Sequence, residues 1–389
     1  MKTEQLLFFL LREELGEIKP TEEEVKSAKK DFWLDQKNEI FDLAKKHDLA
    51  HVVGSGLANL GLLTPADSNY KFFEKECLLA VYRYENQRHE YEKIKNLFIR
   101  EKIDFIPLKG LIASEYYNQP TIRTSCDLDI LIKKECLKKA QNLFMEELGY
   151  KLTNSINYHD IVFTSGSKVK IELHFSLTEG VPDMDSVLET VWDYAASVNG
   201  TSEYRLTNEF FLFHIISHSA YHFLCGGCGI KPIMDLFVLG KKLNVNQDEL
   251  NDLLEKAKLN KFYGVALALK DAWFNGEEHN ETTSMIARFI LSGGAYGSRE
   301  NEIIIQNVKA GSKLKYFFSR MFLPYQKLKL VYPVLNKHKW LFPFCQIARW
   351  FSFLFGVKNQ NGVNEIAVLT SAKKDDINKA KTLLEEVGL

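Results

Sequence analysis

The spacing of apolar residues divides the chain into three parts. From Tyr70 to Lys102, apolar residues recur at intervals of three and four with charged residues between them, as in Phe73, Cys77, Leu78, Val81 and Tyr82. This period predicts helix. The helical pattern returns at about Asn208 with a strongly apolar run, 208–224. We therefore predict a helical N-terminal region (1–100) and a helical C-terminal region (206–389) on either side of a different middle part (101–205).

The middle part alternates short strand-like runs with helical ones. Strands are predicted at 105–108 and 126–132, and helices at 111–117 and at 133–150, the latter closed by Gly149. Residues 160–177 have the pattern of a hairpin turning at Ser165–Ser167. In its second arm Val169, Ile171, Leu173 and Phe175 face one way, and Lys170, Glu172 and His174 face the other. The predicted fold class is α+β, with a small mixed sheet between helical regions.

Two aspartates on the strand 126–132 are the most informative residues. Asp127 and Asp129 lie on one face, about 7 Å apart along the strand. Their like charges repel unless a cation lies between them. With Glu172 on a neighbouring strand, they could hold two Mg²⁺ ions for phosphoryl or nucleotidyl transfer. The ordinary alternative is an exposed strand face that carries acids without any ligand.

Two features beside these acids favour a phosphate ligand. Lys109 and Gly110 stand between a strand and a helix, where glycine lets backbone N–H groups approach a phosphate. Arg123 lies four residues before Asp127 and can offer a guanidinium to phosphate oxygens. Its alternative interpretation is a plain surface arginine.

The same residues resemble a known family. The segment FIPLKGLIASEYYNQPTIRTSCDLDILI, followed after 37 positions by KIELHFSL, is similar to the uncharacterised nucleotidyltransferase family of the DNA polymerase β-like superfamily. The shared motifs are Leu108-Lys109-Gly110, Tyr117 and Pro120, Arg123, Asp127-Leu128-Asp129 and Ile171-Glu172-Leu173-His174. The segment with His214, His218 and Asp235 is similar to the family's C-terminal part, so the resemblance spans about residues 90–350.

This resemblance implies a nucleotidyltransferase core in which Asp127, Asp129 and Glu172 bind two Mg²⁺ ions and Glu172 helps to activate an acceptor hydroxyl. Lys109, Gly110, Arg123 and His174 are then the predicted nucleotide-binding residues, His174 lying behind the metal ligands or on the acceptor side. The chain departs from the superfamily in two ways. Lys109-Gly110 replaces a Gly-Ser pair, and sixteen residues separate Gly110 from Asp127.

Histidines and cysteines form a second candidate site. His214, His218 and His222 follow one stripe of a helix, and Cys225 and Cys228 come directly after it, which makes a zinc site chemically feasible. The alternative is a set of core or pocket histidines followed by a glycine-rich turn, because such a turn does not easily present four tetrahedral ligands.

A third candidate is the stretch 303–364. It contains no acidic residue, ten Lys or Arg and thirteen aromatic residues, including Trp340, Phe342, Phe344, Trp350, Phe351, Phe353 and Phe355. Such a stretch can bind single-stranded nucleic acid or make peripheral contact with an anionic membrane. The simpler interpretation is core aromatic residues with solvated lysines.

Composition narrows the class of protein. The chain has 389 residues, 46% of them hydrophobic, a net charge of −1 and six cysteines that are mostly scattered. These values predict several domains, argue against a general polyanion binder and indicate reduced thiols. The longest apolar run near the start has six residues, too few for a signal peptide, and we expect a cytoplasmic protein without integral membrane association.

Three functions remain open at this stage. The first is Mg²⁺-dependent transfer of a nucleoside monophosphate from an NTP such as ATP to an unidentified acceptor hydroxyl on a small molecule, RNA or protein. The second is a catalytically silent nucleotide-binding scaffold. The third is a toxin- or antitoxin-like nucleotidyltransferase acting on RNA or protein.

Overall fold

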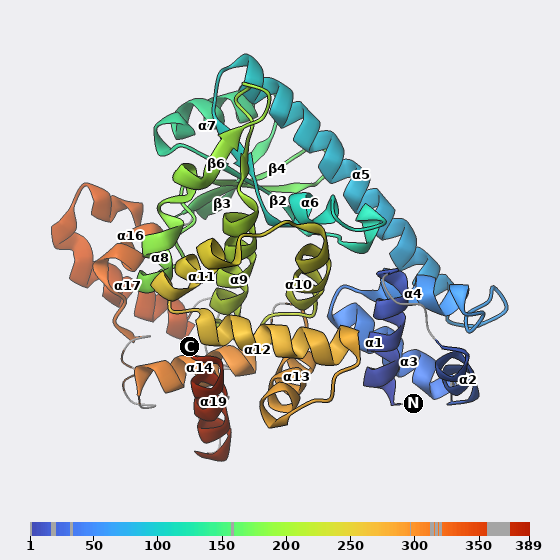
Figure 1. Ribbon diagram of the computed structural model, residues 1–389. Helices are drawn as coiled ribbons and strands as arrows, with labels where there is room; N and C mark the ends of the chain where they lie inside the picture. The colour runs from blue at the N-terminus through green and yellow to red at the C-terminus, as the bar shows by residue number, and fades with distance from the viewer. Residues whose placement is uncertain are drawn as a thin grey trace.

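The computed structural model describes residues 2–16, 21–31, 34–156, 159–295, 297–311, 315, 318, 321–355 and 374–389. The predicted α+β class is confirmed, since a small mixed sheet lies among helices (Figure 1). The N-terminal helices are α1 (Thr3–Glu14), α2 (Glu22–Asp31), α3 (Leu34–Lys46), α4 (Ala50–Asn59) and α5 (Tyr70–Arg100).

Five strands form the main sheet in the order β1-β2-β5-β4-β3. They are β1 (Phe105–Pro107), β2 (Asp127–Ile132), β3 (Lys151–Ile156), β4 (Asp160–Thr164) and β5 (Lys170–His174). Only β2 and β5 pair in parallel, and the other neighbours are antiparallel. The predicted strands at 105–108 and 126–132 and the hairpin 160–177 are thus confirmed, while β3 was not predicted.

Shorter elements connect and extend this sheet. They are α6 (Lys109–Ser114), α7 (Leu137–Glu146), α8 (Pro182–Leu188) and a small hairpin of β6 (Ala195–Ser197) and β7 (Tyr204–Leu206). Gly149 has a φ of +66°, a conformation that suits glycine, and it lets the chain turn from α7 into β3.

The two faces of the sheet have different partners because strand residues alternate. Leu128, Ile130 and Ile132 of β2 belong to one buried cluster with α5 and α7, in which the rings of Phe98 and Phe144 stack at 5.4 Å. Leu131 instead belongs to the large core on the other side. Asp127 and Asp129 lie on the same face of β2 as Leu131, so their carboxylates point toward the large core and away from α5 and α7.

That large core joins both ends of the chain. It contains buried residues of α1, α3 and α4 together with residues of the C-terminal helices, and the ring of Phe8 stacks on Trp273 at 4.3 Å. The division at 100 and 205 stays a prediction. The C-terminal helices are α9 (Asn208–Leu224), α10 (Lys231–Lys242), α11 (Gln247–Lys256), α12 (Asn260–Lys270), α13 (Glu281–Gly293), α14 (Arg299–Ala310), α16 (Tyr325–Val331), α17 (Phe342–Phe355) and α19 (Lys374–Val387).

Helix α5 confirms the predicted element but not its inner face. Phe73, Ile94 and Phe98 are buried, whereas Leu78 and Tyr82 are 67% and 59% exposed. The 31-residue helix is about 47 Å long, and buried residues recur along it from Phe73 to Phe98, so the body of the molecule covers one face of it while Leu78 and Tyr82 lie off that face. The apolar pattern therefore predicted the helix without predicting which of its faces is buried.

Candidate active site

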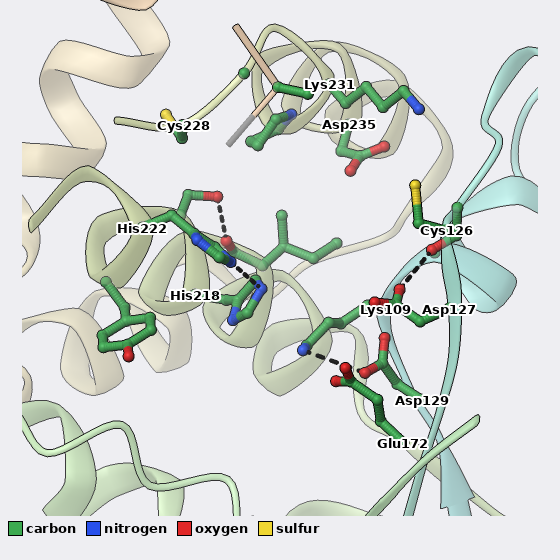
Figure 2. Close-up of a pocket in the computed structure, with 18 of the residues that line it drawn as sticks. Lys109, Cys126, Asp127, Asp129, Glu172, His218, His222, Cys228, Lys231 and Asp235 are labelled. Carbon is green, nitrogen blue, oxygen red and sulfur yellow. Dashed lines mark hydrogen bonds and ion pairs between the residues drawn. The ribbon is translucent and has the colours of Figure 1, made fainter. Parts of the chain in front are cut away.

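Adjacent parallel strands bring the predicted acids together. The register of β2 and β5 pairs Asp129 with Glu172 and Asp127 with Lys170. Because side chains on one face recur every second residue, the three carboxylates point to the same side of the sheet. Figure 2 shows Asp127, Asp129 and Glu172 side by side on one wall of a cavity.

Asp129 is the most buried of the three acids, at 5% exposed. His174 Nε2 lies 2.9 Å from its Oδ1, and Lys109 Nζ lies 3.5 Å from the same oxygen. Burial opposes ionisation, but Lys109 and His174 outweigh it and hold the pKa of Asp129 well below its ordinary value. Asp129 is therefore an anion at neutral pH.

Glu172 shares one of these partners. Its Oε2 lies 3.6 Å from His174 Nε2, and its Oε1 accepts a hydrogen bond from Lys170. Burial would raise the pKa of Glu172, yet the hydrogen bonds from His174 and Lys170 lower it. Among the residues that the structure describes, Asp129, Glu172 and His174 are the one group of three or more metal-ligating side chains whose donor atoms lie within 4.8 Å of one another.

Asp127 is held less tightly. Ser125 Oγ donates to its Oδ1 at 3.1 Å, and Lys170 Nζ is 3.8 Å from its Oδ2. Burial, followed by repulsion from Asp129 and Glu172, raises the pKa of Asp127 to about 6. A divalent cation between these carboxylates would remove that repulsion.

Three cationic groups match the three carboxylates. Burial would lower the pKa of His174, but its hydrogen bonds to Asp129 and Glu172 raise it to about 9, so the ring is an imidazolium at neutral pH. The pKa of Lys109 and that of Lys170 are also raised, since the attraction of the carboxylates outweighs burial. The three carboxylates offer oxygen ligands, which Mg²⁺ prefers, so this set of donor atoms fits such an ion.

The predicted Lys109-Gly110 turn opens α6 beside these acids. Lys109 has a φ of +44° and points its ammonium group at Asp129. A Cβ on Gly110 would lie 2.8 Å from Ser125 Cβ, so glycine allows the loop that carries Ser125 to approach. Phosphate binding by Lys109 and Gly110 stays a prediction.

Arg123 forms a buried ion pair that the sequence did not reveal. Its Nε and Nη2 donate to Asp235 Oδ1 and Oδ2 at 2.7 and 2.8 Å, and Tyr117 donates to the same carboxylate at 2.7 Å. Burial of Arg123 is outweighed by Asp235, which raises the pKa of the guanidinium further. Arg123 lines the cavity, and its contact with phosphate stays a prediction.

Helix α9 forms the opposite wall. His218 Nδ1 lies 3.1 Å from Glu179 Oε1, and His218 Nε2 lies 2.9 Å from His222 Nε2. Burial raises the pKa of Glu179 to about 7 and lowers the pKa of His222 to about 4. Figure 2 shows His218 and His222 across the cavity from the carboxylates.

The candidate zinc residues do not form a ligand cluster among the described residues. Of the five, none belongs to a group of three or more donors within 4.8 Å. The glycines between and after Cys225 and Cys228 have a packing role instead. A Cβ on Gly229 would lie 2.8 Å from Ala295 Cα, so this turn lies directly against the chain after α13.

The cavity between these walls has a volume of about 400 Å³. Sequence reasoning missed Glu179, Lys170, Lys231 and Asp48 as lining residues. Lys231 Nζ reaches Asp48 and also donates to the carbonyl oxygen of Thr124 at 2.9 Å. Lys170 could have been found, because it shares the strand face of Glu172. Asp48 carries no local signal.

The third candidate stretch is described only in part. The side chains of Phe353 and Phe355 lie outside the described part of the chain, and so does the whole segment 356–364. The indole of Trp350 donates to the Met321 carbonyl oxygen at 2.6 Å, while Trp340 and Phe344 are 68% and 60% exposed. The core interpretation therefore fails for Trp340 and Phe344.

Comparison with known proteins agrees with the geometry. The sequence matches the family model described as uncharacterised nucleotidyltransferase over residues 35–275. No curated protein matches the chain. The matched region is more than half of the chain and includes both strands that carry the carboxylates. The chain therefore belongs to the uncharacterised nucleotidyltransferase family.

Proposed function

We propose that this chain transfers a nucleoside monophosphate from an NTP to an acceptor hydroxyl and releases pyrophosphate. The observation that carries the proposal is the pairing of Asp129 with Glu172 across parallel strands, with Asp127 on the same face, at a cavity of about 400 Å³. Family membership supports nucleotidyl transfer as the class of reaction.

Asp127, Asp129 and Glu172 would hold two Mg²⁺ ions, which supply charge neutralisation at the reacting phosphates. Lys109 and Lys170 already lie at these carboxylates and can turn toward phosphate oxygens, which are also anionic. His174 donates to Asp129 and keeps that carboxylate in place.

The reaction forms one bond and breaks another. The acceptor oxygen bonds to the α-phosphorus while the bond to the bridging oxygen of the β-phosphate breaks, and pyrophosphate leaves with that electron pair. We assign the hydroxyl proton to Glu172. The acceptor would enter from the side of α9, where Glu179, His218 and His222 line the cavity.

We place the reaction in the cytoplasm, where NTPs are abundant. All six cysteines are free thiols, which agrees with a reducing compartment. Residues of α9, which forms the wall opposite the sheet, would determine which acceptor and which nucleotide base bind.

Calorimetric titration with ATP tests the proposal. Wild type and the Asp127→Asn/Asp129→Asn variant are each titrated with ATP, once in the presence of Mg²⁺ and once in the presence of EDTA. We expect Mg²⁺-dependent binding in wild type and at least about tenfold weaker binding in the variant, because two metal ligands are lost. Asp104→Asn/Asp252→Asn, which alters two surface ion pairs, is the matched control.

ATP labelled at the α-phosphate then tests turnover. We expect label to pass to an acceptor with equal release of pyrophosphate, and Asp129→Asn to lower this rate by more than about 1,000-fold. Equal binding by wild type and the double variant would contradict the site. Binding without pyrophosphate release for every acceptor tried would favour the scaffold instead.

A further inference from the structure

The helical segment that ends the aromatic stretch has an apolar face open to solvent. Trp340, Phe344, Ile347 and Phe351 follow one another at intervals of four, three and four residues, which places them on one side of α17 and the short turn before it. We call these four residues the aromatic stripe. They are 68%, 60%, 44% and 60% exposed.

The opposite side of α17 is fixed by contacts. Cys345 and Gln346 are buried, Gln346 Nε2 donates to the Leu323 carbonyl oxygen at 2.5 Å, and Trp350 Nε1 donates to the Met321 carbonyl oxygen. Cys345 also packs in a small core with Leu328 and Leu335. These contacts fix the orientation of α17, so the stripe on its other side points toward solvent.

The stretch of sequence that carries the stripe has charged side chains of one sign. No acidic residue occurs between Ile303 and Asn364, and the exposed Lys337 and Lys339 stand directly before Trp340. Exposed apolar residues of α5 differ in this respect, because Phe72, Leu78 and Tyr82 are interspersed with exposed Glu74 and Glu85. Of the exposed apolar surfaces of α5 and α17, only the surface of α17 favours an anionic partner.

The stripe has the dimensions of an interfacial helix. From Trp340 to Phe351 it extends about 17 Å along the helix axis. Tryptophan and phenylalanine on one face with lysines beside them are typical of helices that lie flat in the headgroup region of a bilayer. Figure 1 shows α16 and α17 at the margin of the molecule, in orange.

We propose that the aromatic stripe of α17 docks this protein on an anionic lipid bilayer, with Lys337 and Lys339 contacting lipid headgroups. None of the helices in the described part of the chain combines the length and apolarity needed to cross a bilayer. The proposal goes beyond nucleotidyl transfer and does not depend on it.

Vesicle co-sedimentation tests this proposal with the full chain. Vesicles of pure phosphatidylcholine are compared with vesicles of equal parts phosphatidylcholine and phosphatidylglycerol. We expect wild type to pellet with the anionic vesicles and the Trp340→Ser/Phe344→Ser/Phe351→Ser variant to bind them at least about tenfold more weakly. Because these side chains are exposed, the melting temperature should be unchanged, which circular dichroism checks.

Two further variants separate the contributions. Lys337→Gln/Lys339→Gln should weaken binding to anionic vesicles by about 30-fold and make it less sensitive to salt. Phe72→Ser/Leu78→Ser/Tyr82→Ser on α5 is the matched control and should bind as wild type does. Brominated lipids should quench the fluorescence of wild type more than that of Trp340→Phe.

Other occupants of the stripe give distinct results. Wild type that stays in the supernatant with anionic vesicles, or a stripe variant that pellets like wild type, would overturn the proposal. So would a stripe variant that loses only self-association in sedimentation velocity, or only binding to single-stranded RNA in a mobility shift. Nucleotide binding and pyrophosphate release are measured separately, and their failure leaves this result unchanged.

Discussion

His174 on the sheet and His214 on α9 are buried to nearly the same degree, at 4% and 3% exposed. Burial alone would lower the pKa of both. It does so for His214, where Lys109 adds to the effect and the pKa falls to about 3. At His174 the hydrogen bonds to Asp129 and Glu172 outweigh burial and raise the pKa to about 9. The charges that face a histidine, and not its depth, decide whether this protein holds it protonated.

The comparison extends to the two sides of the cavity. The sheet side carries three carboxylates with three cationic partners, whereas the α9 side carries histidines that burial keeps neutral. In the reaction that we propose, the polyphosphate and its metal would bind at the first side, and a neutral or hydroxyl-bearing acceptor would bind at the second.

The largest expected effect comes from breaking the buried ion pair that joins the loop before β2 to α10. Asp235→Asn on α10 removes the charge that Arg123 pairs with, at a site where the two side chains are 2% and 13% exposed. We expect a loss of about 3–5 kcal/mol in the free energy of unfolding, because a buried guanidinium is left without its counter-charge. Urea denaturation measures it.

Asp252→Asn is the matched control for this measurement. It removes the partner of Lys256 in an exposed pair of α11, and we expect no measurable change in stability. If Asp235→Asn lowered the free energy of unfolding no more than this control, the buried pair would not stabilise the packing of α10 against the loop before β2.

A smaller effect isolates the charged side. In the metal-free protein in EDTA, His174 is protonated at higher pH when folded than when unfolded, so its contribution is fully present below pH 6.5 and is lost as pH rises through about 9. Its full size is about 3 kcal/mol. Urea unfolding of wild type and His174→Gln over this pH range should show a flatter profile for the variant, and parallel profiles would refute the protonated ring.

The smallest effect isolates the neutral side. Below pH 6.5 the unfolded chain protonates His214 but the folded chain does not until about pH 3, so stability falls as pH falls. Between pH 6.5 and 5 the loss is about 2 kcal/mol. His214→Gln should lose less over that interval in the same assay, while His89→Gln, at an exposed histidine of α5, should match wild type.

Much of the fold could be predicted because its signals are local. Strand alternation predicted β2, β4 and β5, and helical period predicted α5 and α9. The edge strand β3 escaped because KLTNSI has little apolar alternation, and Leu152 is 43% exposed. The buried face of α5 could not be distinguished from its exposed face, because burial depends on elements that are distant in sequence.

The grouping of the three carboxylates could be predicted for the same reason, but the buried pair of Arg123 and Asp235 could not. Asp127, Asp129 and Glu172 share strand faces, which a period of two reveals. Arg123 and Asp235 are 112 positions apart, and only the packing of α10 beside the loop before β2 joins them. No local pattern carries such information.

The matching of Lys109, Lys170 and His174 to the three acids has a consequence for protein turnover. Since the acids have internal partners, the chain can complete its folding before it acquires an ion. For the Mg²⁺-dependent reaction that we propose, a cell depleted of divalent cations would then keep an intact but inactive pool of the chain instead of losing it to proteases. In that case, supplying the ion would restore the proposed activity without new synthesis.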